Sequence, residues 1–386
     1  MNIILNTESV SFPLTGIGRY TYELARALER QAEIDSLRFF AAGRFVPQLS
    51  YAEQPHAPAA PRKLSGLKGL VQKSTLAMEL YRHVAERLRA NGLEGQTGCI
   101  YHGPNFFLPR YQGPCVATFH DLSPFTWSHC IEPAKVRYMQ KELRKTLDRA
   151  DRLITVSDAI RYELAEYFSY PLERIDTVPL ACSPDFRPRP QSVVQDVLNR
   201  HGLAYQGYTL FVGTIEPRKN IQSLLKAYRQ LPIATRLRWP LVLTGFKGWL
   251  SADIHHSIQA AEREGWARYL GYLPAQELPL LYGGARLFSF PSHYEGFGLP
   301  VLEAMSSGVP VVCSNSSSLP EVSGGAALLH APDDIDTLSQ HLAQGLEDSA
   351  WRQTAISQGM AHTAGFSWQR CAAETVAVYQ KLAAGV

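Results

Sequence analysis

One stretch in the second half of the chain constrains the fold most, because it joins a buried strand, a glycine turn and a helix start. The apolar run Arg286–Phe290 indicates a strand, and Gly296 and Gly298 form the turn that follows it. Glycine lets the backbone N–H groups of a tight turn come close to a ligand. Pro300 suits the first turn of a helix. The free N–H groups near Phe297 to Leu299, together with the helix dipole, therefore predict an anion site.

Two carboxylates flank this anion site. Glu295 lies in the turn, and Glu303 lies about one turn inside the helix. One carboxylate can face one end of a ligand and the other can face the opposite end. That arrangement suits a nucleotide-sugar, in which a diphosphate joins a hydroxylated sugar to a ribose. The alternative is that Glu303 belongs to a helix capping box, but Pro300 stands where the box needs Ser or Thr.

A pair of cations is predicted at the same end of the sheet. The strand Thr209–Val212 leads to Arg218, Lys219 and Asn220. We expect Asn220 to cap the helix 221–231, which places both cations at a helix N-terminus. Two cations beside a helix start form a clamp for a diphosphate. The alternative is a pair of solvated surface charges.

The first half adds two features at the ligand side of its sheet. The strand 114–119 delivers His120 to its carboxyl end, which faces the ligand crevice of an open parallel sheet. Gly16 and Gly18 open a helix after the first strand, but Thr21 stands where a dinucleotide fingerprint needs its third glycine. A simple strand-to-helix turn is the alternative for the glycines. A structural role is the alternative for His120.

Length and composition restrict the class of protein. The 386 residues fit two domains, and the proline-rich segment Cys182–Pro190 indicates the linker. Strands alternate with helices on both sides of this segment, which predicts parallel sheets covered on both faces. A net charge of +3 does not indicate nucleic acid binding. Six scattered cysteines fit a reducing cytosol, and we expect no signal peptide and no membrane-spanning helix.

Three other features leave alternatives open. Residues 62–89 carry seven basic and two acidic side chains among apolar ones. They predict either a helix that lies on an anionic membrane or an ordinary surface helix. The aromatic residues of the loop 103–109 either contact an acceptor or close the core. Asp334 and Asp336 match a metal-binding Asp-x-Asp, but they precede a helix, so we expect capping and no metal site.

The stretch Glu295-Gly-Phe-Gly-Leu-Pro-Val-Leu-Glu303 resembles the signature of the retaining glycosyltransferases of family 4, which have the GT-B fold. The resemblance extends over nearly the whole chain. His120 resembles the active-site histidine of that family, and Arg218-Lys219 resembles its Arg-Lys pair. Many members have an additional arginine where this chain has Thr214. The resemblance therefore implies that the catalytic residues are His120, Arg218, Lys219 and Glu295.

The resemblance also implies further donor-binding residues. Gly16 and Gly18 fill the place of a glycine loop that lies against the donor phosphates or the acceptor. Tyr272 and Leu273 fill the place of a loop that holds the base. Together with these, the implied donor site comprises Arg218, Lys219, Glu295, Phe297, Gly298, Leu299 and Glu303.

The implied fold is an α/β protein of the GT-B type, with two Rossmann-like domains whose parallel sheets face a central cleft. The first domain would cover residues 1–187 on the acceptor side. The second would cover residues 188–366 and bind the nucleotide-sugar. In the family the terminal helix, here 367–386, crosses back to the first domain.

The implied activity is that of a retaining glycosyltransferase that uses a nucleoside-diphosphate sugar. Its transition state gains negative charge on the leaving diphosphate, which Arg218, Lys219 and the N–H groups of the turn can stabilise. Glu295 would hold sugar hydroxyls and Glu303 the ribose. The acceptor attacks the front face, and the donor phosphate helps to accept its proton. We therefore expect neither a cofactor nor a metal ion.

The overall pattern is most similar to bacterial mannosyl- and rhamnosyltransferases of surface-polysaccharide assembly. It favours GDP-mannose as donor and a glycan or a lipid-linked oligosaccharide as acceptor. We expect a cytoplasmic protein. If residues 62–89 lie on a membrane, the protein would be peripheral on the inner face of the cytoplasmic membrane; the surface-helix alternative stays open. Two other classes stay open. A nicotinamide oxidoreductase should carry a full glycine fingerprint, and a non-catalytic nucleotide- or glycan-binding partner should form no product.

Overall fold

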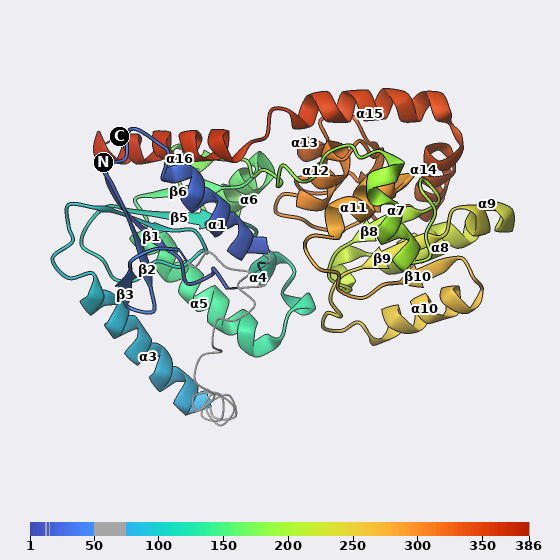
Figure 1. Ribbon diagram of the computed structural model, residues 1–386. Helices are drawn as coiled ribbons and strands as arrows, with labels where there is room; N and C mark the ends of the chain where they lie inside the picture. The colour runs from blue at the N-terminus through green and yellow to red at the C-terminus, as the bar shows by residue number, and fades with distance from the viewer. Residues whose placement is uncertain (12–13, 15, 50–74, 386) are drawn as a thin grey trace.

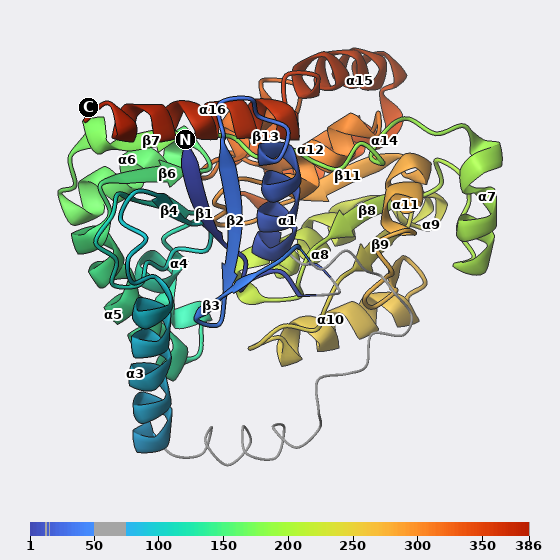
Figure 2. The same ribbon diagram turned by 60° about the vertical axis from the view of Figure 1, so that its left-hand side comes forward.

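Two parallel β-sheets, one in each half of the chain, form the frame of the molecule (Figure 1). The structure is a computed structural model that describes residues 1–11, 14, 16–49 and 75–385, with side chains in helix α3 from residue 84 on. Helices lie on both sides of the sheets (Figures 1 and 2). The predicted α/β fold with two Rossmann-like sheets is confirmed.

The first half contains a seven-stranded sheet. Its strands are β1 (Asn2–Asn6), β2 (Ser36–Ala41), β3 (Arg44–Val46), β4 (Ile100–Gly103), β5 (Cys115–Phe119), β6 (Arg152–Thr155) and β7 (Ile175–Thr177). Its helices are α1 (Gly16–Leu28), α3 (Thr75–Gly92), α4 (Ser123–Thr126), α5 (Pro133–Arg149) and α6 (Asp158–Phe168), with the 3-10 turns η1 (Ser128–Cys130) and η2 (Leu172–Arg174). The strands follow the order β3-β2-β1-β4-β5-β6-β7. Only the edge pair β2 and β3 is antiparallel among these described neighbours.

The second half contains a six-stranded, fully parallel sheet. Its strands are β8 (Thr209–Val212), β9 (Leu241–Thr244), β10 (Ala267–Tyr269), β11 (Leu287–Phe290), β12 (Val311–Ser314) and β13 (Leu328–His330). Its helices are α7 (Gln191–Arg200), α8 (Ile221–Gln230), α9 (Ile233–Arg238), α10 (Ala252–Arg263), α11 (Leu278–Gly284), α12 (Leu299–Ser306), α13 (Leu319–Ser323), α14 (Ile335–Glu347) and α15 (Ser349–Thr363), with η3 (Pro217–Lys219) before α8. The strands follow the order β10-β9-β8-β11-β12-β13. The two sheets lie on either side of residues 182–190, the predicted linker.

Burial explains why the central strands form where the sequence predicts them. β8 and β11 are buried along their whole length. Parallel strands are covered on both faces and therefore consist of continuous apolar residues. The predicted strand Thr209–Val212 agrees with β8 at both ends, and the predicted strand Arg286–Phe290 begins one residue before β11 and ends with it.

The last helix, α16 (Trp368–Ala383), lies over the first half, although it follows the second in sequence (Figure 1). It packs against α1 and β6. Ser367 caps it, because its side chain accepts a hydrogen bond from the Arg370 N–H. The Tyr379 hydroxyl lies 2.6 Å from Nδ1 of the buried His102 on β4. The chain therefore crosses between its halves twice.

The loop 103–109 closes the core. Phe106 is only 3% exposed, and Phe107 packs partly buried against the same cluster. The core alternative for these aromatic residues is therefore the right one.

The basic segment 62–89 is described only in part, since residues 62–74 lie outside the described residues. In the described part of α3, Arg89 pairs with Glu8 at 2.9 Å. This arginine is therefore engaged within the protein. The membrane hypothesis stays a prediction.

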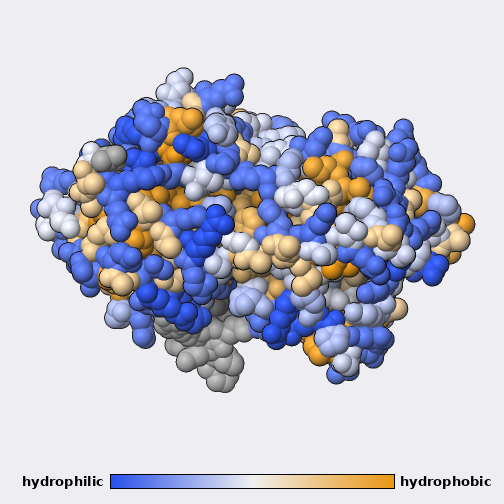
Figure 3. Space-filling model, turned by 90° about the horizontal axis from the view of Figure 1, so that it is seen from above, coloured by the Kyte–Doolittle hydropathy of each residue, from blue (hydrophilic) through white to orange (hydrophobic). Residues whose placement is uncertain are grey.

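Seen from the side of α15 and α16, most of the surface is hydrophilic, and hydrophobic residues form separate patches (Figure 3). Among the described residues, no helix combines the length and the apolar character needed to cross a membrane.

Candidate active site

Two neighbouring strands bring the predicted cations and the first carboxylate together. The order of the second sheet reverses between β8 and β11, and open α/β sheets bind ligands outside the strand ends at such a point. Arg218 and Lys219 lie in η3, which follows β8. Glu295 lies in the turn after β11. The three side chains therefore meet at the switch point of the sheet.

Lys219 makes a buried ion pair with Glu295. Its Nζ atom donates to Oε1 of Glu295 at 2.5 Å and lies 5.1 Å from the centre of the Phe290 ring. Burial acts to raise the pKa of Glu295, but the charges of Lys219 and Arg218 hold it below its ordinary value. For Lys219 burial prevails, so its pKa is lowered despite the neighbouring carboxylate.

Arg218 connects this pair to a second carboxylate. Its Nη2 atom donates to Oε1 of Glu216 at 2.7 Å, and its Nη1 atom donates to the Tyr294 carbonyl at 2.6 Å. Nη1 also lies 3.5 Å from Oε2 of Glu295. Burial acts to lower the pKa of Arg218, but Glu295 and Glu216 raise it. We call Glu216, Arg218, Lys219 and Glu295 the clamp cluster, in which two positive groups face two negative ones.

Asn220 does not cap α8, so that prediction was wrong. It occupies the N-cap position with a φ of 54°, in the left-handed region, and its side chain makes no capping hydrogen bond. A capping side chain needs an extended backbone at this position. Instead, Nδ2 of Asn220 donates to the carbonyls of Pro291 at 3.1 Å and Pro332 at 2.7 Å. Asn220 therefore ties the loop of the two cations to the end of β11.

A serine-rich segment, Ser314–Ser318, holds the turn that carries Glu295. The Glu295 N–H donates to the Ser317 hydroxyl at 2.8 Å. The Ser318 hydroxyl lies 2.9 Å from the Glu295 carbonyl and 2.5 Å from the Phe297 carbonyl, to which it donates. Sequence reasoning missed these residues. The available signal was a run of hydroxyl side chains directly after a predicted strand.

His120 meets this turn from the first half of the chain. Its Nε2 atom lies 2.8 Å from the Pro104 carbonyl, which only accepts, so Nε2 carries a hydrogen. The rings of Tyr20 and Phe106 contact it edge-on, and burial lowers its pKa, which favours the neutral imidazole. A Cβ atom on Gly296 would lie 1.7 Å from the His120 carbonyl oxygen. Only glycine permits this close approach of the two halves.

The start of α12 has the predicted form. Gly298 precedes the helix with a φ of 117°, and α12 begins at Leu299 without a side-chain cap. Phe297 is buried beside this start. The N-terminus of α12 therefore follows the turn that carries Glu295, and the clamp cluster lies beside the same turn.

Glu303 lies one turn inside α12 and is half-buried. Burial raises its pKa to about 7, while the Tyr282 hydroxyl and the charge of Arg19 act in the opposite direction. Sequence reasoning did not select Arg19. It directly follows Gly18, so the glycine pair could have drawn attention to it.

The other predicted donor-binding residues lie at the ends of α1 and β10. Gly16 is exposed with a φ of 30°, and α1 starts at this residue. A Cβ atom on Gly18 would lie 2.6 Å from the Ser9 carbonyl oxygen, so packing alone requires glycine here. Tyr272 is 40% exposed and stacks on Phe246, with ring centres 4.0 Å apart. Leu273 beside it is buried. The roles of these residues in donor binding stay predictions.

Asp334 and Asp336 are engaged at the start of α14. Asp334 caps the helix by accepting a hydrogen bond from the Thr337 N–H at 2.9 Å, and Asp336 accepts one from Gln230 at 2.9 Å. The capping interpretation is confirmed. Within the described ranges of the chain, His, Cys, Asp and Glu side chains form no group of three that could hold a metal ion.

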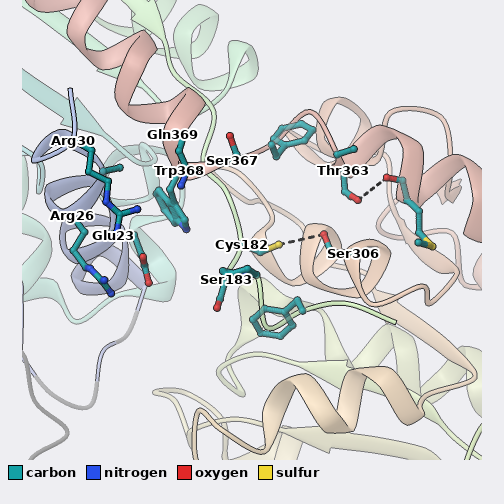
Figure 4. Close-up of a pocket in the computed structure, with 16 residues that line it drawn as sticks. Glu23, Arg26, Arg30, Cys182, Ser183, Ser306, Thr363, Ser367, Trp368 and Gln369 are labelled. Atoms are coloured by element: carbon teal, nitrogen blue, oxygen red, sulfur yellow. Dashed lines mark hydrogen bonds between the residues drawn. The ribbon is translucent and has the colours of Figure 1, made fainter. Parts of the chain in front are cut away.

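A pocket of about 450 Å³ lies where the chain crosses between its halves (Figure 4). Residues from α1, the linker, the end of α12 and the junction of α15 with α16 line it, among them Arg26, Cys182, Phe186, Ser306 and Trp368. The Cys182 thiol lies 3.3 Å from the Ser306 hydroxyl. None of the predicted site residues lines this hinge pocket, so it is distinct from the clamp cluster.

Comparisons with known proteins identify the family of the chain. The family model described as "Glycosyltransferase Family 4" matches residues 14–186, and the one described as "Glycosyl transferases group 1" matches residues 201–361. The O-antigen chain mannosyltransferase B of Escherichia coli is 46% identical over 382 residues, which cover 99% of this chain and all of that protein.

Two solved structures share the fold over the full length of both chains. Sucrose-phosphate synthase from Thermosynechococcus elongatus matches with a TM-score of 0.69 and 19% identity. Anabaena Alr3699/HepE, solved in complex with UDP-glucose, matches with a TM-score of 0.65 and 16% identity.

Proposed function

This chain is a glycosyltransferase that belongs to group 1 and family 4, and from this premise we propose that it transfers mannose, with retention of configuration, from GDP-mannose to a surface polysaccharide. The relative that is 46% identical is a mannosyltransferase of the O-antigen chain. The observation that carries the proposal is the buried clamp cluster at the switch point of the second sheet. The presence of two cations at this switch point supports a binding site for a nucleotide diphosphate there.

The proposed reaction exchanges one bond at the anomeric carbon of mannose. The bond from this carbon to the diphosphate breaks, and a bond to an acceptor hydroxyl oxygen forms on the same face. The acceptor proton passes to the departing phosphate. The leaving group takes both electrons of the broken bond. Arg218, Lys219 and the N–H groups at the start of α12 stabilise the resulting charge, because they are fixed in place before the reaction.

The two carboxylates of the signature bind opposite ends of the donor in this proposal. Glu295 accepts hydrogen bonds from the mannose hydroxyls, and Glu303 accepts them from the ribose. His120 borders the mannose from the first half. Tyr272, Leu273, Gly16 and Gly18 line the remainder of the donor site.

The two cations of the clamp cluster support a reaction without a metal ion or cofactor. A diphosphate leaving group must be neutralised by a metal ion or by protein donors. Here Arg218 and Lys219 provide that charge.

We place the reaction in the cytoplasm, with the growing glycan on a membrane lipid as acceptor. All six cysteines are free, which suits a reducing compartment. The basic segment 62–89 would bring the protein to the anionic inner face of the membrane. Co-sedimentation with anionic liposomes should then fall as salt rises, because ions screen the attraction. Absence of binding at low salt would leave only the surface-helix interpretation.

Product formation tests the proposal. Purified protein is incubated with GDP-mannose, UDP-glucose, ADP-glucose or dTDP-rhamnose and a mannose-terminated acceptor, and the product is identified by mass and by the configuration of its new linkage. We expect transfer from GDP-mannose and an α-linked product. Transfer only from another donor would overturn the choice of mannose. Nucleotide binding without any product would favour the non-catalytic alternative.

A further inference from the structure

Tyr294 is the residue in which the clamp cluster and the opposite half of the molecule meet. It directly precedes Glu295 and is only 5% exposed. Its carbonyl accepts the hydrogen bond from Nη1 of Arg218 at 2.6 Å. Its hydroxyl extends into the first half, where it accepts from the Leu122 N–H at 2.9 Å and donates to Oε2 of Glu163 at 2.7 Å.

The ring and the hydroxyl of Tyr294 contact residues of the first half. Its ring stacks beside Trp127, with centres 6.3 Å apart and an angle of 27°. Leu122 comes two residues after His120, so the partner of the hydroxyl lies next to the histidine of the candidate site. Burial raises the pKa of Tyr294, so the group remains a neutral hydroxyl that can both donate and accept.

Neighbouring hydrogen bonds also join the first half of the chain to the second. The Ser157 hydroxyl donates to the Gly296 carbonyl at 2.7 Å. The N–H groups of Asp158 and Ala159 donate to the carboxylate of Glu321 at 3.0 and 3.3 Å. The described structure is therefore a closed arrangement, in which the start of α6 rests on the signature turn.

We propose that Tyr294 is a positioning residue that couples closure of the cleft to the alignment of Arg218 and Glu295. One peptide unit carries both effects, since the Tyr294 carbonyl holds the guanidinium and the next N–H belongs to Glu295. When the cleft closes, the hydroxyl docks on Leu122 and Glu163 and fixes this peptide unit. When the cleft opens, the hydroxyl loses both partners and the cations of the clamp lose their fixed direction.

This inference rests on the proposed function for its kinetic readout, whereas the closure itself is measurable without catalysis. The test variant is Tyr294→Phe, which keeps the ring and its stacking on Trp127 and removes only the hydroxyl. The matched control is Tyr228→Phe. The Tyr228 hydroxyl is also buried and contacts Thr209 at 2.8 Å and the Trp239 carbonyl, but it lies within α8, away from the cleft.

We expect Tyr294→Phe to lower kcat at least about tenfold and to change the Kd of GDP by less than about threefold, because the nucleotide binds the second half. Solution scattering with GDP should show a larger radius of gyration for this variant than for the wild type. Tyr228→Phe should retain kcat and the compact form. Glu163→Gln keeps an oxygen acceptor and should retain more than about a third of the wild-type kcat.

Wild-type kcat and wild-type compaction in Tyr294→Phe would overturn the proposal. So would an equal loss of kcat in Tyr228→Phe, because a buried hydroxyl would then act through stability alone. If the wild type transfers no mannose, the proposed function fails, and the scattering comparison still decides whether Tyr294 controls closure.

Discussion

Replacing Lys219 by methionine should separate the stability of the clamp cluster from its catalytic role. Methionine has a similar length and no charge, so Lys219→Met leaves Glu295 buried without its 2.5 Å partner. Removing one member of a buried ion pair typically costs ~3–5 kcal/mol. Arg218 remains 3.5 Å from the carboxylate and moderates this loss. We therefore expect a destabilisation near the lower limit, about 3 kcal/mol.

The kcat of Lys219→Met should fall by more than the loss of folded protein can explain. Loss of one preorganised donor at a developing negative charge costs about 10²–10³ in kcat. Initial rates with saturating GDP-mannose measure this loss, and thermal unfolding without ligand measures the destabilisation. Lys226→Met serves as control, since Lys226 is exposed on α8. It should leave both quantities close to the wild type.

The double variant Lys219→Met/Glu295→Gln tests whether the loss of stability and the loss of activity have separate causes. It removes both charges of the pair, so it should be more stable than Lys219→Met by about 2 kcal/mol. It should be at least as inactive as the single variant, because no cation is restored and the Glu295 carboxylate is also lost. The reasoning is refuted if the double variant is no more stable than Lys219→Met. It is also refuted if Lys219→Met keeps turnover within a few-fold of the wild type.

Three further predictions follow from the titratable groups and from the protein's own cations. The pKa of Glu303 is about 7. If the ionised carboxylate binds the ribose, kcat/KM for the donor should rise as pH increases through 7, and Glu303→Gln should abolish this rise. The buried His102 has a pKa lowered to about 3 by burial, so the unfolded chain takes up its proton first as pH falls below 6.5. Stability should then decrease by ~1.4 kcal/mol per pH unit between 6.5 and 3, and urea unfolding at pH 7 and pH 5 should show a smaller decrease for His102→Gln. Turnover should persist in excess chelator, and manganese should not rescue Lys219→Ala; loss of activity in chelator with recovery on adding manganese would contradict the metal-free proposal.

The sequence predicted the parts of the site that depend on neighbours along the chain. The strand β11, the glycine turn and the helix α12 follow from an apolar run, two glycines and a proline within 15 residues, from Arg286 to Pro300. Their local geometry determines where N–H groups point. The two cations follow β8 in the same way, so their position at the sheet end was predictable.

The contacts that fix the site could not be predicted, because they join distant segments. The partner of the Tyr294 hydroxyl, Glu163, lies 131 residues earlier in the chain. The Ser317 hydroxyl holds the Glu295 N–H across 22 residues. Asn220 was mispredicted for a related reason. Its side chain donates to the carbonyls of Pro291 and Pro332 in place of a capping hydrogen bond, and the sequence around the helix start does not reveal these distant partners.

The clamp cluster also explains why a carboxylate stands beside cations that are proposed to bind an anion. An unpaired buried charge costs several kcal/mol, so Arg218 and Lys219 need partners while no donor is bound. Glu216 and Glu295 supply those partners and hold the cations in place. An arriving diphosphate brings its own negative charge, which frees Glu295 to accept hydrogen bonds from the sugar, while Glu216 can remain with Arg218. Glu295 therefore has two roles, as a partner of the cations in the free protein and as an acceptor for the sugar. Its loss should leave the cations less firmly held and should weaken binding of the sugar. Loss of Lys219 leaves Glu295 buried without its partner and also removes a cation that would stabilise the leaving group. The double variant relieves the first effect and not the second, so it can regain stability and still fail to catalyse.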